Sequence, residues 1–235
     1  AHAQLRAAVT ARNLADSAHR KRLHAAIASH LERLPVDDPL RESEMMFHLI
    51  GAGDALRAAK LYGDASSLVG GQELRGATRA LRGHLLPATA EEGKGPGFAW
   101  LCSMLDQEAL APLERQTVVH RCLKELYEAL ENDAPMEFRL EFLRTIRARQ
   151  ALRPSPAPSE LANLALGDRR IGALLLQMGD ISEAISSFKA AVNASEQLAA
   201  VEPAEPEWQR DIAVSRNRLG DAFLAAGGVA DALTC

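Results

Sequence analysis

The chain has 235 residues, of which 47% are apolar and 25% charged, ordinary values for a folded globular protein. Only 4% are aromatic, which disfavours an all-β fold because sheets are rich in aromatic and β-branched side chains. The net charge of −4 lacks the basic excess of a nucleic-acid-binding protein, and no apolar stretch reaches the roughly 18 residues of a membrane helix.

The three cysteines, Cys102, Cys122 and Cys235, form no C-x-x-C pair and have no metal-ligand spacing. They are typical of reduced thiols, so we expect a cytoplasmic protein. The sequence begins without Met and without the apolar core of a signal peptide, and it ends inside a periodic segment. We interpret it as a piece of a larger protein.

Residues 1–86 are predicted to form a helical connector region. A first helix should end before Pro35, and a second should begin at Asp38 and end near Gly51 and Gly53. Asp54 is a candidate N-cap for the next helix. The first helix carries an apolar stripe at helical spacing, namely Leu23, Ile27, Leu31 and Leu34.

Two stretches rich in proline and glycine, 87–97 and 153–159, are predicted linkers. Between them, 97–152 is predicted to form helical hairpins. One of its helices should begin at Pro112 and continue to about Glu131. The third part, 159–235, contains the strongest pattern in the chain.

That pattern is an internal repeat with an offset of 48 residues. Gly220 follows Gly172, and Gly227 follows Gly179, at this spacing. Self-similarity at a fixed period indicates a repeat architecture. The first pair should permit close helix crossing, and the second should occupy turns that require positive φ. The same offset relates Ile171 to Leu219, Leu175 to Phe223, Ile181 to Val229 and Ala184 to Ala232.

The helices of this part are predicted to be long, at about 181–201 and 206–226. Phe188 is expected to fill the space between adjacent hairpins. Trp208 should pack at the start of the later helix.

These residues resemble the tetratricopeptide repeat, whose pattern is L-G-x-x-Y, then G, then A-x-x-x-F. The usual period is 34 residues, so this is an extended form. The phrase EPEWQRDIAVSRNRLGDAFLAAG resembles arrays in bacterial STAND-type signalling NTPases, relatives of NOD-like receptors. Arg22-Leu23-His24 and Ala52-Gly53-Asp54 resemble the segment that follows the NTPase part of such proteins. The resemblance covers about 16–64 and 160–235.

The resemblance implies an all-α fold in which antiparallel helix hairpins stack as a right-handed α-solenoid. It also implies a protein or peptide partner, no cofactor and no catalysis. Concave surfaces of such arrays bind partners. The candidate partner-binding residues, chosen from helix phase, are Arg169, Arg170, Gln177, Arg216, Asn217 and Asp221.

Other chemistry is weakly supported. The seven histidines form no H-E-x-x-H motif, so we expect no metal site and interpret His24 and His48 as core or interface residues. Gly93-Lys94-Gly95 lacks the rest of a phosphate-binding loop, so linker is the favoured interpretation. Arg139, Arg144, Arg147 and Arg149 are expected to form ion pairs within their helix, with a carboxylate clamp as the alternative.

We therefore expect a protein-interaction module, the sensor or scaffold part of a larger bacterial signalling or defence protein. The alternative is a helical regulatory domain that senses a small molecule and controls an attached effector. Binding to a membrane is not expected, and binding to nucleic acid is disfavoured. The last repeat should expose an apolar edge that includes Leu224, Val229 and Leu233, through which the chain could self-associate.

Overall fold

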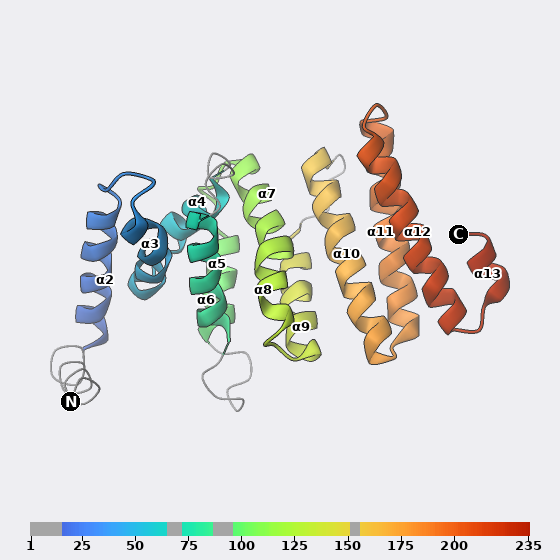
Figure 1. Ribbon diagram of the computed structural model, residues 1–235, viewed down its shortest axis with the longest axis horizontal. Coiled ribbons are helices and arrows are strands. Elements are labelled where there is room, and N and C mark those ends of the chain that lie inside the picture. The colour runs from blue at the N-terminus through green and yellow to red at the C-terminus, as the bar shows by residue number, and fades with distance from the viewer. Residues whose placement is uncertain (1–15, 65–71, 87–95, 151–155) are drawn as a thin grey trace. The chain divides into compact units, whose positions relative to one another are not determined.

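The computed structural model describes residues 16–64, 72–86, 96–150 and 156–235, and within them the protein is all α-helical, without strands (Figure 1). The predicted fold class is confirmed at this level. The chain divides into two compact units, 1–118 and 119–235, and each is described by itself. Most of the residues that would define the predicted linkers 87–97 and 153–159 lie outside the described residues, so the three-part division stays a prediction.

The first unit contains short helices that pack on their neighbours in sequence. Helix α3 contacts α2, α4 and α5, and α6 contacts α4 and α5. Their apolar faces are closed by fully buried side chains, including Leu49 and Tyr62. The helices are α2 (Ser17–Leu31), α3 (Pro39–Ala52), α4 (Ala55–Gly63), α5 (Gln72–Leu85) and α6 (Pro96–Leu105), and α7 (Pro112–Arg121) follows them.

Caps explain where two of these helices begin and where one ends. The Asp38 carboxylate accepts hydrogen bonds from the backbone N–H groups of the first turn of α3, and Asp54 caps α4 in the same way. Gly53 ends α3 with a positive φ of 75°. Gly51 has a different role from the one predicted, because it lies inside α3 and makes room for the His24 ring.

Gly97, where the predicted linker and the predicted middle helical part meet, belongs to helix α6. A Cβ added at Gly97 would lie 2.3 Å from the backbone oxygen of His84 in α5, closer than atoms can approach. The glycine therefore allows the two helices to meet backbone to backbone.

The helix predicted to run from Pro112 to about Glu131 is interrupted. A π-helical turn, Cys122–Leu126, separates α7 from α8 (Tyr127–Glu131). Such a turn shifts the hydrogen-bonding pattern by one residue and rotates the side chains that follow it. Cys122, Leu123 and Leu126, which form this turn, all lie in the core with no exposed surface. The apolar face of the helix therefore stays buried although its side chains rotate at the turn.

The second unit continues with α9 (Met136–Arg147), α10 (Pro158–Met178), α11 (Ile181–Val201), α12 (Pro206–Ala225) and α13 (Val229–Leu233). Helices α10 and α11 form a long hairpin, and α12 packs along α11 (Figure 1). The bounds of α11 and α12 confirm the predicted long helices at about 181–201 and 206–226. Trp208 lies half-buried in the first turn of α12, where its indole N–H donates to Glu202 over 2.9 Å.

The turns of the hairpins confirm the predicted role of two glycines. Gly179 joins α10 to α11 with a φ of 86°, and Gly227 follows α12 with a φ of 79°. The 48-residue offset also holds for the helix starts, since α12 begins 48 residues after α10, and α13 begins 48 residues after α11. The repeat is therefore one of helix pairs.

Gly172 marks the close crossing of α10 and α11. A Cβ at this position would lie 2.9 Å from carbon atoms of the Phe188 ring, which is itself fully buried. Phe188 therefore packs inside its own hairpin, where the sequence pattern predicted a place between adjacent hairpins. Ala184 is also fully buried.

Candidate interaction surface at α12 and α13

Helix α12 carries an uncovered stripe of side chains at helical spacing. Its four members, which we call the α12 stripe, are Val214, Asn217, Asp221 and Leu224, and all are exposed. Two of them are apolar, with Val214 40% and Leu224 55% exposed. Apolar side chains open to solvent at regular spacing on one helix face are typical of a binding surface.

The repeat shows what covers such a stripe elsewhere in the same unit. Forty-eight residues earlier, α10 has Leu166, Arg169, Ala173 and Leu176, and all four are half-buried. Within that earlier stripe, the Arg169 guanidinium forms an ion pair of 3.1 Å with Asp211 of α12, and only 18% and 24% of the two side chains is exposed. Helix α12 therefore contacts the earlier stripe at Arg169. The α12 stripe itself is exposed at the equivalent place.

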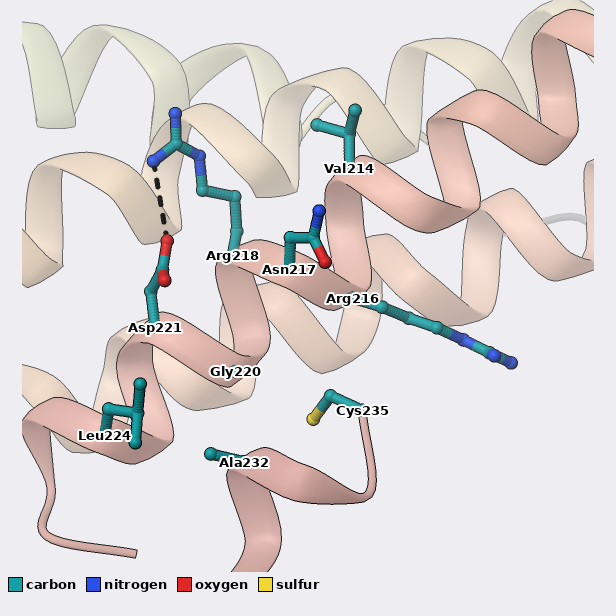
Figure 2. A pocket seen from close by; sticks show the side chains of 9 residues that line it. All are labelled: Val214, Arg216, Asn217, Arg218, Gly220, Asp221, Leu224, Ala232 and Cys235. Carbon is teal, nitrogen blue, oxygen red and sulfur yellow. Dashed lines mark ion pairs between the residues drawn. The ribbon is translucent and has the colours of Figure 1, made fainter. Parts of the chain in front are cut away.

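A cavity of about 560 Å³ lies beside the α12 stripe, against α13 (Figure 2). Besides the stripe itself, its wall includes Gly220 on the α12 side and Ala232 on the α13 side. Neither has a long side chain, so the space between the two helices stays open. The remaining lining residues are Arg216, Arg218 and Cys235.

The charges at this cavity are exposed and loosely paired. Arg218 lies 3.7 Å from Asp221 one turn away, with 62% and 57% of the two side chains exposed. Such surface pairs contribute little stability, so either partner is free to exchange for another. Arg216 extends away from both of them (Figure 2) and pairs with Glu196 of α11 over 2.6 Å.

The structure brings three of the six predicted partner-binding residues to this cavity, namely Arg216, Asn217 and Asp221. Gln177 is exposed near the end of α10, away from the α12 stripe in sequence. Arg169 and Arg170 are engaged between helices. The Arg170 guanidinium lies 3.0 Å from Glu128 and 4.4 Å from the centre of the Tyr127 ring. The partner-binding role of all six stays a prediction.

The predicted apolar edge of the last repeat is confirmed as exposed. Leu224, Val229 and Leu233 are 55%, 58% and 83% accessible. The sequence-based choice of site residues missed Val214, Arg218 and Cys235. Val214 could have been found from its offset of three residues from Asn217, which places it on the same face.

The arginines of α9 pair with other helices. Arg147 contacts Asp168 of α10 over 2.9 Å, and Arg144 contacts Glu183 of α11. The expectation of ion pairs within the helix is therefore wrong for these two, because the nearest carboxylates come from the neighbouring hairpin. These contacts stabilise the packing of α9 on α10 and α11.

His24 and His48 form the most unusual polar contact of the first unit. Their Nδ1 atoms lie 2.9 Å apart, so one ring must donate an N–H to the other. Phe47 stacks edge-on against both rings. Burial lowers the pKa of His48, the neighbouring His24 lowers it further, and Glu44 opposes the shift. The interpretation of both as interface histidines agrees with this contact between α2 and α3.

This contact predicts a pH dependence of stability. In the folded state His48 binds a proton less readily than in the unfolded state, where the pKa of a histidine lies near 6.5. His48 therefore contributes to the stability of the folded state above pH 6.5. This contribution is lost as the pH falls from 6.5 toward the lowered pKa of His48 in the folded state. Urea unfolding from pH 8 to 5 should show this slope, and His48→Gln should reduce it. The control is His30→Gln, because His30 is exposed. If His48→Gln and wild type had the same slope, His48 would not be the source of the pH dependence.

Cys122 and His120, two residues apart in sequence, have different surroundings. Cys122 is fully buried, and burial raises the pKa of its thiol to about 12. His120 instead contacts the buried Asn163 of α10 over 3.1 Å. The motif Gly93-Lys94-Gly95 lies outside the described residues. Met45 and Met46 are core residues.

Among the described residues, no three His, Cys, Asp or Glu side chains gather closely enough to hold a metal ion. None of the helices in those same ranges has the length and apolar character required to cross a membrane. Known protein-family models, curated proteins and solved structures yield no match to this chain.

Proposed function

We propose that this chain is a protein-interaction module, non-catalytic by itself, whose binding surface is the α12 stripe and the adjoining cavity. The observation that carries the proposal is the contrast between two equivalent helix faces. The earlier stripe on α10 is half-buried and contacts α12 through Arg169, whereas the α12 stripe is exposed. A surface of this shape fits a helix or an extended peptide from a partner protein.

The proposal also includes the type of repeat and the kind of larger protein to which the chain belongs. The helix-pair repeat at a 48-residue offset supports a tetratricopeptide-like, right-handed α-solenoid, since both helices of the first pair, α10 and α11, contact α12 of the next. The resemblance of the sequence to STAND-type proteins supports a sensor or scaffold role in a larger bacterial signalling or defence protein of the cytoplasm.

A second candidate function is favoured by the cavity itself. Its volume of about 560 Å³ lies within the range of small-molecule sites. Arginine, asparagine and aspartate side chains line it beside apolar ones, a mixture that orients a polar ligand. A regulatory domain that senses a metabolite and controls an attached effector would use the same residues.

One experiment separates these functions. The double variant Val214→Glu, Leu224→Glu places two charges on the α12 stripe at exposed positions, so the fold should persist. We expect wild type to capture a partner protein from a bacterial extract and the variant to lose at least tenfold in affinity when that partner is purified and titrated.

The matched control is Val36→Glu, Val201→Glu, which adds the same charge at apolar positions that are 63% and 57% exposed elsewhere. Equal binding by the stripe variant and this control would refute the proposed surface. If no captured protein depends on the stripe, and a metabolite raises the Tm of wild type but not of the stripe variant, the ligand-sensing function replaces it.

A further inference from the structure

The α12 stripe has a pattern that reads the same in both directions. Val214, Asn217, Asp221 and Leu224 follow the alternating three- and four-residue spacing of a helix seam. The outer two are apolar. Of the inner two, Asn217 carries an amide that donates hydrogen bonds, and Asp221 carries a carboxylate that accepts them. A half-turn about the centre of the stripe exchanges the two halves.

This symmetry makes the stripe complementary to itself. When two such helices lie antiparallel about a two-fold axis, Val214 lies opposite Leu224 of the second copy, and Asn217 lies opposite Asp221 of the second copy. The amide N–H of Asn217 then donates to a carboxylate, and each contact occurs twice, as in any two-fold interface. The two outer layers of valine and leucine then enclose two inner layers, in each of which an asparagine is hydrogen-bonded to an aspartate.

The electrostatics permit this pairing. Asp221 forms an ion pair with the exposed Arg218 of its own helix, a pair of little strength. Arg218 stays beside Asp221 in the pair, so the two polar layers bring together equal numbers of positive and negative charges. Arg216 also lines the cavity, but its guanidinium extends away from the stripe (Figure 2) and pairs with Glu196, so its charge is balanced within one copy.

The space beside the stripe also suits a second helix. The cavity between the α12 stripe and α13 is bounded by Gly220 and Ala232, the two small residues of its wall. In the preceding repeat, the equivalent face of α10 is contacted by a helix, through Arg169 and Asp211. That helix, α12, follows α10 by way of α11 and runs in the same direction as α10 (Figure 1). In the proposed pair, the open face of α12 would also be covered by a helix, but one that comes from a second copy and runs in the opposite direction.

We propose that two copies of this chain associate through antiparallel pairing of their α12 stripes. The proposal rests on the proposed function, of which it names one partner, a second copy. It also assigns a role to the inner residues Asn217 and Asp221, namely to set the orientation and register of the pair, while Val214 and Leu224 supply the apolar contact.

A charge-swap experiment tests this proposal. Asn217→Asp gives an acidic stripe in which each polar layer opposes two carboxylates. Asn217→Lys combined with Asp221→Lys gives a basic stripe in which each layer opposes two ammonium groups. Both positions are exposed, and circular dichroism checks that the helices are retained. Sedimentation is measured under reducing conditions, so that a disulfide through Cys235 cannot imitate association.

We expect wild type to shift with concentration from 25.3 kDa to twice that mass. Each charged variant alone should associate at least tenfold more weakly. An equimolar mixture of the two should restore association, because every layer then pairs a carboxylate with an ammonium group. A wild type that stays monomeric at high concentration, or a mixture that stays monomeric, would overturn the pairing. Neither result affects partner capture, which the stripe variant Val214→Glu, Leu224→Glu tests separately.

Discussion

Replacing Phe188 with alanine is expected to lower the free energy of unfolding by about 3–5 kcal/mol. The ring has no exposed surface and fills the crossing of α10 and α11, where Gly172 leaves room for it. Its removal leaves a cavity that the helix backbones cannot close without shifting. Urea denaturation followed by far-ultraviolet circular dichroism measures the loss.

A second substitution at the same crossing makes the test specific. Gly172→Ala should destabilise wild type, because the added Cβ would lie 2.9 Å from the Phe188 ring. In the Phe188→Ala background the same change should stabilise by up to about 1 kcal/mol, since alanine favours a helix over glycine. The control is Gly83→Ala in α5, where an added Cβ meets nothing within 4 Å. If Gly172→Ala had the same sign in both backgrounds, the ring would not be what requires the glycine.

The hairpin could be predicted from the sequence because its signals are local. Gly179 and Gly227 end helices with positive φ, which other residues adopt at a cost. The apolar periodicity and the flanking prolines gave the bounds of α11 and α12 to within a residue. Each of these features depends on a few neighbouring residues and not on the rest of the fold.

The phase change within the helix that starts at Pro112 could not be predicted. The segment around Cys122 has a continuous apolar stripe and no glycine or proline. Its π-helical turn places Cys122, Leu123 and Leu126 together in the core, so packing decides the backbone. Packing preferences of this kind leave no pattern in a single sequence.

The same limit applies to the candidate site. Helix phase placed Asn217 and Asp221 on an outward face, and both line the cavity. Phase alone could not show that Arg169 is used by Asp211, because these residues are 42 positions apart and meet only when α12 packs against α10. Arg218 was missed for a related reason, since the cavity depends on where α13 lies.

Arg147→Met is expected to lower the free energy of unfolding by about 2–4 kcal/mol, near the lower end of the range for breaking a buried ion pair. Asp168 is only 9% exposed, and Arg147, at 28%, is its partner. Methionine keeps the apolar stem of the side chain but leaves the carboxylate without its countercharge. Arg144→Met is the matched control, because Arg144 and its partner Glu183 are 46% and 56% exposed, so the loss should stay below about 1 kcal/mol.

The pH dependence of the stability lost in Arg147→Met shows whether the charge of Asp168 causes the loss. Burial raises the pKa of Asp168, and the hydrogen bond and charge of Arg147 oppose that shift. Without Arg147 the pKa rises further, so ionising the carboxyl costs more stability as the pH increases above 3.8. The difference between wild type and Arg147→Met should therefore shrink as the pH falls and Asp168 becomes protonated in both.

Neutralising the carboxyl provides the decisive comparison. In Arg147→Met, Asp168→Asn neither position carries a charge, so no unpaired carboxylate is buried and most of the lost stability at pH 7 should return. A loss that is equal at all pH values, or that persists in the double variant, would show that the charge of Arg147 is not what stabilises the packing of α9 on α10. Recovery together with the pH slope would show that Asp168 requires a cation because it is buried.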